Sequence, residues 1–285
     1  MERNTDQEHP KDAKYLLPEP QKEVDRLTAN ASVFAYGMNN RRVLAPLDMT
    51  KPGLKVLDSV TADGLFLRAI EPLLAKPCAL SGYDIMPSFF PTSYSPHFTY
   101  GVHNLAEPWP VDMHGQYHLV HQRFALPGGG KTATPRQSVG YLSKLVAPGG
   151  WIQLGEMDVK KPAKGGQAIT DAMVLMRAMF KAVCGSDSFA YDMSDWLREE
   201  GFEDVTEEIF EIPLGPLCDD PVIGKRGVDR GVQSWQAVLG VVQKLKLDVD
   251  ESVTDNIIGR FTDELTRDGG AYNLRFVYGR APSRK

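Results

Sequence analysis

Two acidic segments at the ends of apolar runs give the first indication of chemistry in this chain. Val56-Leu57-Asp58 breaks into Ser59-Val60-Thr61-Ala62-Asp63-Gly64, and Asp84 lies twenty residues beyond Gly64 at the end of another apolar run. A loop between a strand and a helix presents unpaired backbone N–H groups, which suit a carboxylate or another polar ligand group. A carboxylate at the spacing of Asp84 can accept both hydroxyls of a ribose, although it can also serve only as a turn or helix cap. Together, the loop and Asp84 favour an adenosine-containing ligand.

Histidines gather in one stretch of the chain, where five of the six fall between His97 and His121. His121 ends an apolar run, and an imidazole that titrates near neutral pH suits a general base. His121 is therefore the candidate catalytic residue, with a structural histidine as the alternative. His118 and His121 have the spacing of a metal-ligand pair, but no third ligand has a suitable spacing, so we expect no metal site.

Apolar runs that alternate with helical patterns must position these groups. Strands are predicted at 54–58, 79–85, 98–102, 117–121, 151–155, 205–212 and 273–278. Helices are predicted at 21–38, 65–74, 138–146, 168–183, 193–200, 232–246 and 254–265, with lid-like loops at 186–193 and 215–231. This alternation favours an α/β fold, in which right-handed βαβ units build a mostly parallel sheet with helices on both faces. Ligands bind such sheets at the carboxyl ends of the strands, where Asp58, Asp84 and His121 stand.

Composition and charge narrow the classes of function. The chain has 285 residues, of which 42% are hydrophobic and 24% charged, and its formal net charge is −5. This is typical of one globular domain, and the lack of a dense basic block argues against binding nucleic acid or an anionic membrane. No apolar run is long enough to span a bilayer, and three widely spaced cysteines indicate reduced thiols, so we expect a cytoplasmic location. Residues 1–20 are interpreted as a flexible tail, and we expect a monomer or homodimer.

Short motifs follow one another in order over residues 15–280. They are Tyr15-Leu16-Leu17-Pro18, Val56-Leu57-Asp58, Gly82-Tyr83-Asp84-Ile85, Glu107-Pro108-Trp109-Pro110, Leu119-Val120-His121-Gln122-Arg123, Pro148-Gly149-Gly150-Trp151-Ile152-Gln153-Leu154, Glu156 and Glu200-Gly201-Phe202. In this order they resemble the fungal class I methyltransferases of secondary metabolism, which use S-adenosylmethionine. The resemblance implies a Rossmann-like fold with a seven-stranded, mostly parallel sheet, S-adenosylmethionine as cofactor and a small-molecule secondary metabolite as substrate. We expect one domain over 21–285, with helical insertions at about 165–200 and 214–266 as a cap on the acceptor side.

The resemblance also implies roles for individual residues. His121 would lie beneath the sulfonium of the cofactor and face the acceptor. The residues implied to bind the cofactor are Asp58 and Gly64 at its methionine end, Asp84 at the ribose, Ile85, Asn104 and Leu105 at the adenine, and Gln122 and Arg123 beneath the sulfonium.

Four residues are candidates for binding the substrate. Glu156 can orient the acceptor or bind a basic nitrogen, although it can equally be a solvated turn residue. Met176 and Phe180 lie at helical spacing in a Met-rich segment, and they either belong to the core or line an apolar acceptor cavity. Tyr15, in the first motif, is the fourth candidate.

One motif departs from the family pattern. The glycine-rich loop D-x-G-x-G-x-G here retains only its last glycine, Gly64. Val60 is stiff and disfavours the positive φ angles that glycine allows, and Asp63 adds a charge near the expected position of the cofactor carboxylate. Two functions therefore remain open: an O- or N-methyltransferase with a modified loop, and an enzyme of the same fold that acts as a cyclase or pericyclase without transferring methyl. A regulatory member that acts through partner proteins is a third hypothesis.

Overall fold

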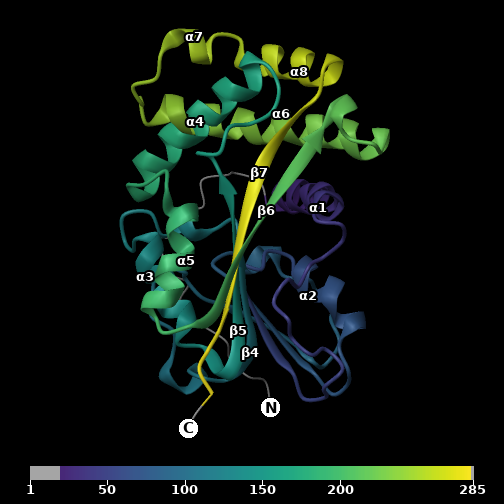
Figure 1. Ribbon diagram of the computed structural model, residues 1–285, viewed down its shortest axis with the longest axis vertical. Helices are drawn as coiled ribbons and strands as arrows, with labels where there is room; N and C mark the ends of the chain where they lie inside the picture. Colours follow the sequence, from purple (N-terminus) through teal and green to yellow (C-terminus); the bar gives the residue numbers. More distant parts are fainter. Residues whose placement is uncertain (1–19, 284–285) are drawn as a thin grey trace, which may run out of the picture.

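A seven-stranded sheet forms the centre of the structure (Figure 1). The computed structural model describes the backbone of residues 20–283, and their side chains from residue 27 onward except that of residue 29. The strands are β1 (Lys55–Ser59), β2 (Ala79–Asp84), β3 (Phe98–Val102), β4 (Tyr117–Arg123), β5 (Val146–Asp158), β6 (Glu203–Leu214) and β7 (Gly270–Arg280). They lie in the order β3-β2-β1-β4-β5-β7-β6, and only β7 runs against its neighbours. The predicted α/β fold with a mostly parallel sheet is confirmed.

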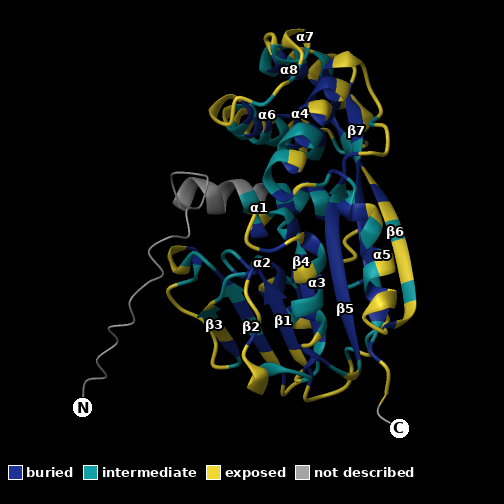
Figure 2. Ribbon diagram, turned by 90° about the vertical axis from the view of Figure 1, so that its left-hand side faces the viewer, coloured by how far each residue is buried: buried dark blue, intermediate teal, exposed yellow. Residues whose placement is uncertain are grey.

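Helices cover both faces of this sheet. The described helices are α1 (Pro20–Gly37), α2 (Leu65–Ile70), α3 (Pro135–Ser143), α4 (Gln167–Cys184), α5 (Phe189–Glu199), α6 (Pro221–Lys244), α7 (Glu251–Thr254) and α8 (Ile257–Arg267). In Figure 1, α3 and α5 lie on one side of the strands, and α1 and α2 on the other. Figure 2 shows the central strands buried and β6 exposed at the edge. No helix within residues 20–283 has the length and apolar character needed to cross a membrane.

Four helices, α4, α6, α7 and α8, gather at one end of the molecule, and we call them the helical cap (Figure 1). Helix α4 contacts the 3-10 turn Leu126–Gly129 that follows β4, so the helical cap lies at the carboxyl ends of the central strands. Helix α5 instead packs against β5, β6 and β7. The predicted insertion at 165–200 therefore contains one helix of the helical cap and one that covers the sheet.

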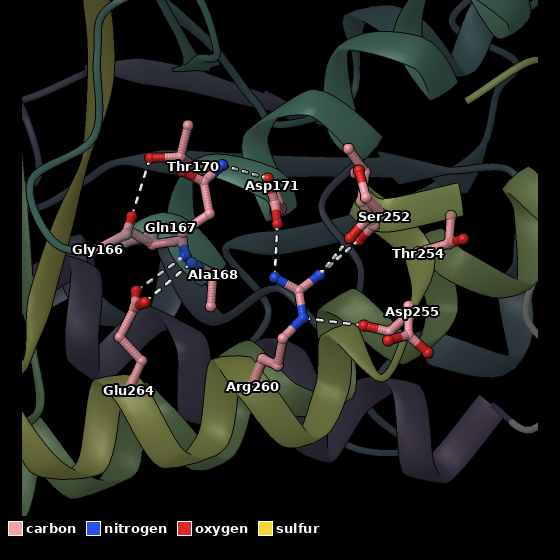
Figure 3. A network of polar contacts seen from close by, with 12 residues as sticks. Gly166, Gln167, Ala168, Thr170, Asp171, Ser252, Thr254, Asp255, Arg260 and Glu264 are labelled. Atoms are coloured by element: carbon pink, nitrogen blue, oxygen red, sulfur yellow. Dashed lines mark hydrogen bonds and ion pairs between the residues drawn. The ribbon is translucent and has the colours of Figure 1, made fainter. Parts of the chain in front are cut away.

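Side chains of α8 fix the start of α4 (Figure 3). The Glu264 carboxylate accepts hydrogen bonds from the backbone N–H groups of Ala168 at 2.9 Å and Ile169 at 3.1 Å. One turn away on α8, Arg260 Nη1 lies 2.6 Å from Asp171 Oδ2. A negative charge at the first turn of a helix satisfies unpaired N–H groups and complements the helix dipole. These contacts hold α4 in place over the sheet.

The segment 215–231, predicted as a lid-like loop, is instead mostly helix α6. Asp220 stands just before the helix, and its Oδ1 accepts from the backbone N–H groups of Val222 at 2.9 Å and Ile223 at 3.1 Å, with Pro221 in the first turn. The glycines that favoured a loop in the sequence serve close packing in the structure. A Cβ on Gly224 would overlap the carbonyl oxygen of Gly215, so this helix approaches the neighbouring backbone more closely than any side chain would allow. Tertiary packing has overridden local propensity here.

We predict opposite effects for two alanine substitutions in α6. Gly224→Ala should lower the free energy of unfolding by about 1–3 kcal/mol, because the added methyl group meets backbone that cannot move aside. Gly240→Ala, in the same helix with nothing within 4 Å of the new methyl group, should raise it by about 0.5–1 kcal/mol. Urea unfolding followed by circular dichroism measures both values, and equal effects would contradict the proposed close packing.

Candidate active site

The loop between β1 and α2 has positive φ angles at the three positions where the D-x-G-x-G-x-G pattern has glycine, although it contains one glycine. Val60 has φ 56°, Ala62 has φ 50° and Gly64 has φ 76°, so three alternate positions are left-handed. Such a conformation costs a residue with a Cβ about 1–2 kcal/mol, and a β-branched side chain such as that of Val60 tolerates it poorly. A backbone hydrogen bond helps to hold the loop in this conformation, since Thr61 N donates to Tyr83 O at 2.9 Å. The structure thus retains here a shape that the sequence disfavours.

A buried contact beneath this loop joins β1 to β4. Asp58 and His121 lie side by side in the parallel ladder, and His121 Nδ1 lies 2.6 Å from Asp58 Oδ1. Thr61 Oγ1 donates to the other carboxylate oxygen at 2.6 Å, which ties the loop to the same group. The imidazole stacks on the Phe66 ring at 3.6 Å between centroids and 9° between planes. Asp58 therefore accepts one bond from the adjacent strand and one from the loop.

This position argues against the predicted role of His121 as a general base that faces the acceptor. Its side chain is 2% exposed, and one ring face is covered by Phe66. Burial lowers the pKa of the imidazole, although the hydrogen bond to Asp58 opposes that effect. A group that holds the loop through Nδ1 from a buried position is better suited to positioning than to removing a proton from a substrate.

Asp84 connects the end of β2 to the same loop. Its Oδ2 accepts from Ala62 N at 2.9 Å and its Oδ1 from Met86 N at 3.0 Å. The residue is 2% exposed, and burial raises the pKa of the carboxyl group. Each carboxylate oxygen still has a lone pair that can accept a further hydrogen bond. Ile85, the next residue, is half-buried.

The turn after β3 is braced by its own side chains. Asn104 Oδ1 accepts from Ala106 N at 3.0 Å, and its Nδ2 donates to Glu107 Oε1 at 3.2 Å. Leu105 is buried in the larger apolar core. Parallel pairing of β1, β2 and β3 places this turn on the same sheet edge as Asp84 and the loop.

An ion pair removes the charge conflict that the sequence suggested for Asp63. Arg68 Nη2 lies 2.6 Å from Asp63 Oδ2, and Arg68 also donates to the Asp63 carbonyl oxygen. The carboxylate is therefore already neutralised by an arginine one turn into α2. Asp63 does not leave an unbalanced negative charge in the loop.

A second polar pair lies on the opposite face of the sheet. Gln122 and Glu156 point away from the side of His121, because side chains alternate along a strand. Glu156 Oε1 accepts from Gln122 Nε2, Ala125 N and Leu126 N, each at 2.9 Å. Both side chains are buried, and Gln122 Oε1 has no hydrogen-bond partner among the described residues. Burial raises the pKa of the Glu156 carboxyl group to about 7. The alternative of a solvated turn residue is wrong for Glu156.

An apolar face of α4 covers this pair. Met176, Phe180 and Cys184 lie one turn apart on one side of the helix, and all three are buried. Burial raises the pKa of the Cys184 thiol, and the nearby charge of Glu156 adds to the effect. Met176 and Phe180 thus belong to the larger apolar core. Tyr15 lies outside the described residues.

Sequence reasoning missed two side chains that organise the loop. Thr61 bonds to Asp58, and Phe66 stacks on His121. Both lie within eight residues of Asp58, so the motif already indicated the segment in which they occur. Nothing in the sequence indicates which members of that segment turn inward.

Comparison with curated proteins identifies several fungal relatives along almost the whole chain. "Methyltransferase psoC" of Aspergillus fumigatus is 30% identical over 259 residues, which cover 91% of this chain and 94% of the relative. "N-methyltransferase sirN" of Leptosphaeria maculans is 30% identical and covers 95% and 96%, respectively. "N-methyltransferase tcpN" of Claviceps purpurea is 31% identical and covers 91% and 94%. No model of a known protein family matches the chain.

Solved structures support the fold alone. A phosphoethanolamine N-methyltransferase 2 of Haemonchus contortus, solved with S-adenosylhomocysteine, superposes with a TM-score of 0.53 at 12% identity. That superposition covers 96% of this chain and 61% of the other chain.

The buried Glu156 carboxyl group predicts a specific dependence of stability on pH. Its pKa of about 7 lies above the 4.5 of an unfolded chain, so the native state holds the extra proton. The corresponding stabilisation is present below pH 4.5 and is lost as the pH rises through about 7. Glu156→Gln keeps an oxygen for the three N–H donors and removes the titration. In urea unfolding, the free energy of unfolding of the variant minus that of wild type should therefore be larger at pH 8 than at pH 4.5. A difference that does not change with pH would contradict this assignment.

Proposed function

This chain belongs to the family of fungal methyltransferases, and on that premise we propose that it transfers the methyl group of S-adenosylmethionine to a nitrogen atom of a small-molecule secondary metabolite. The relatives named N-methyltransferase support the choice of nitrogen. The observation that carries the proposal is the loop from Asp58 to Gly64, whose left-handed positions at Val60 and Ala62 retain a ligand-binding backbone without the usual glycines. This retained path also favours methyl transfer over the cyclase alternative.

The residues at the first two strand ends fit an adenosyl cofactor. A Cβ on Gly64 would overlap the Tyr100 hydroxyl, so the glycine is needed both for its φ angle and for space. We propose that the Asp58–Gly64 loop holds the methionine end and that Asp84 accepts the ribose hydroxyls. Ile85, Asn104 and Leu105 would border the adenine, because the β3 turn reaches the same edge.

The chain's own part in catalysis is to align the acceptor and to receive its proton. S-adenosylmethionine, when bound, would supply an activated methyl group on a positively charged sulfur, with a neutral thioether as the leaving group. We propose that Glu156 accepts a hydrogen bond from the acceptor N–H and takes the proton that this nitrogen loses. A carboxyl group with a pKa of about 7 can do so near neutral pH.

Gln122 and the apolar face of α4 complete this acceptor site. Gln122 Oε1 is buried and has no hydrogen-bond partner among the described residues, which is destabilising unless a ligand N–H donates to it. The core residues Met176 and Phe180 would help to exclude water from the reacting nitrogen. His121 serves as a positioning residue in this arrangement, because it holds Asp58 beneath the loop.

Asp84→Asn tests the cofactor site. Replacing a charged acceptor of two ribose hydroxyls by an amide should weaken the binding of S-adenosylhomocysteine about 10–100-fold in isothermal titration calorimetry. Asp112→Asn, at an exposed position after β3, should leave the affinity unchanged. If wild type shows no binding at millimolar ligand, the proposed function is wrong.

His121→Asn separates a positioning role from a base. If His121 holds the loop, the variant should bind S-adenosylhomocysteine about tenfold more weakly, because an indirect contact of this kind tunes the groups that touch the ligand. Glu156→Gln, on the other face, should keep wild-type affinity. Unchanged affinity in His121→Asn together with lost methyl transfer would restore the general-base role.

A further inference from the structure

Glu156 lies opposite an arginine in the sheet and forms no ion pair with it. Register places Arg275 of β7 directly opposite Glu156 of β5, and both residues are buried. Side chains of residues paired in this way point to the same face of the sheet, with Cβ atoms about 4.5–5.5 Å apart, and opposite charges there attract each other. Among the described residues, however, only uncharged N–H groups donate to Glu156.

Three neighbours hold Arg275 in another direction. Its Nε and Nη2 lie 3.1 and 2.8 Å from Asp158 Oδ2, and its Nη1 donates to Glu207. The Tyr191 ring of α5 covers the guanidinium, whose central carbon lies 3.8 Å from the ring centre. Asp158 and Glu207 lie diagonally from Arg275 on the strands at either side of β7, and their side chains share its face. Arg275 is therefore bonded to its diagonal neighbours and not to the acid opposite it.

Asp158 is itself fixed by the turn that follows β5. Its Oδ1 accepts from the backbone N–H groups of Lys160 at 3.2 Å and Lys161 at 2.9 Å, while Oδ2 accepts from Arg275. The Asp158 side chain is fully buried, whereas that of Glu207 is 32% exposed. Since a charge pair is stronger where water is excluded, Asp158 is the acid that sets the direction of Arg275.

No other described cation takes the place of Arg275 beside Glu156. Burial raises the pKa of Glu156, hydrogen bonds from Gln122 and two backbone N–H groups lower it, and no charged side chain contributes. Arg123, the last residue of β4, points to the opposite face of the sheet. Cys184 of α4 is titratable, but burial raises the pKa of its thiol, which is therefore neutral. The arginines of α3, α4 and α5 have acidic partners of their own: Arg136 with Glu199 and Glu200, Arg177 with Asp187, and Arg198 with Asp195.

We propose that Asp158 is a positioning residue of the acceptor site, which keeps Arg275 away from Glu156 and so leaves this carboxyl group without a cation beside it. A guanidinium bonded to Glu156 would keep the carboxylate ionised and would compete with the acceptor N–H for its oxygens. The described hydrogen bonds to Glu156 all end on Oε1, so Oε2 stays available to a ligand. The inference rests on the proposed role of Glu156 in methyl transfer, and it adds Asp158 to the residues on which that role depends.

Titration of Glu156 in the Asp158→Asn variant tests this inference. The amide keeps an oxygen for the N–H groups of Lys160 and Lys161 but offers no charge to Arg275, which can then turn to Glu156. The midpoint of the Glu156 titration, about 7 in wild type, should fall by about 1–3 units, because a nearby opposite charge favours the ionised form. Carbon-13 NMR of protein labelled at the glutamate side-chain carboxyl groups measures the midpoint, and the signal missing from Glu156→Gln identifies Glu156.

Two further variants separate the charge of Arg275 from other effects of the substitution. In the double variant Asp158→Asn/Arg275→Met, no arginine is left opposite Glu156, so the midpoint should return to about 7. Asp187→Asn is the matched control, because Asp187 is also buried and lies 3.0 Å from an arginine, Arg177 of α4. It should leave the midpoint at its wild-type value.

An ion pair with only a structural role would give a different result. Asp158→Asn would then lower the melting temperature and leave the midpoint of Glu156 at about 7, which would overturn the inference. A lowered midpoint that persists in the double variant would also overturn it, since the shift would not come from Arg275. Glu207→Gln is a milder variant for the case that Asp158→Asn does not fold. Asp158 still holds Arg275 there, so a lowered midpoint in Glu207→Gln would contradict the role given to Asp158.

The outcome for Asp158 is distinguishable from the outcome for the proposed function. The titrations use protein without ligand, and their result does not depend on whether the chain transfers methyl groups. Failure of the proposed function is detected separately, by the absence of S-adenosylhomocysteine binding in calorimetry. A midpoint lowered in Asp158→Asn and restored in the double variant would in that case still establish that Asp158 keeps Arg275 away from Glu156.

Discussion

The hydrogen bond between His121 and Asp58 is the contact on which the site depends. It lies inside the sheet between two adjacent strands, and a second bond from Thr61 ties the following loop to the same carboxylate. A buried acid must be fully hydrogen-bonded to be tolerated, so the position of Asp58 fixes the groups around it. The loop can then keep left-handed backbone at Val60, where the side chain alone would oppose it. Stability of the surrounding sheet compensates for strain in the loop.

Alternation of side chains along β4 divides the site into two compartments. His121 and Arg123 face the side of the Asp58–Gly64 loop, and Gln122 faces the side of α4. One strand end thus serves the proposed cofactor and acceptor sites together, so the reacting atoms would meet where β4 stops. The opposing shifts of His121 and Glu156 follow from the same burial, because desolvation disfavours whichever form is charged.

The helical cap covers the end of β4. Glu264 and Arg260 of α8 hold the first turn of α4, and the apolar side of α4 then covers Glu156. Helix α6 completes the helical cap, and its glycines permit close packing. Because glycines are also typical of loops, the same residues suggested a loop in the sequence. Water kept away from Glu156 is the physical cause of its raised pKa.

The sequence by itself determined the α/β fold, the order of the motifs and the strand ends at which Asp58 and Asp84 stand. Hydrophobic periodicity is a local property, and it suffices to place elements and their ends along the chain. Only the tertiary structure decided which way His121 points, how Asp63 is neutralised and that the Arg42 carbonyl oxygen accepts from Gln153. Those outcomes depend on contacts between segments up to about a hundred residues apart, and the local pattern of one sequence carries no record of such pairings.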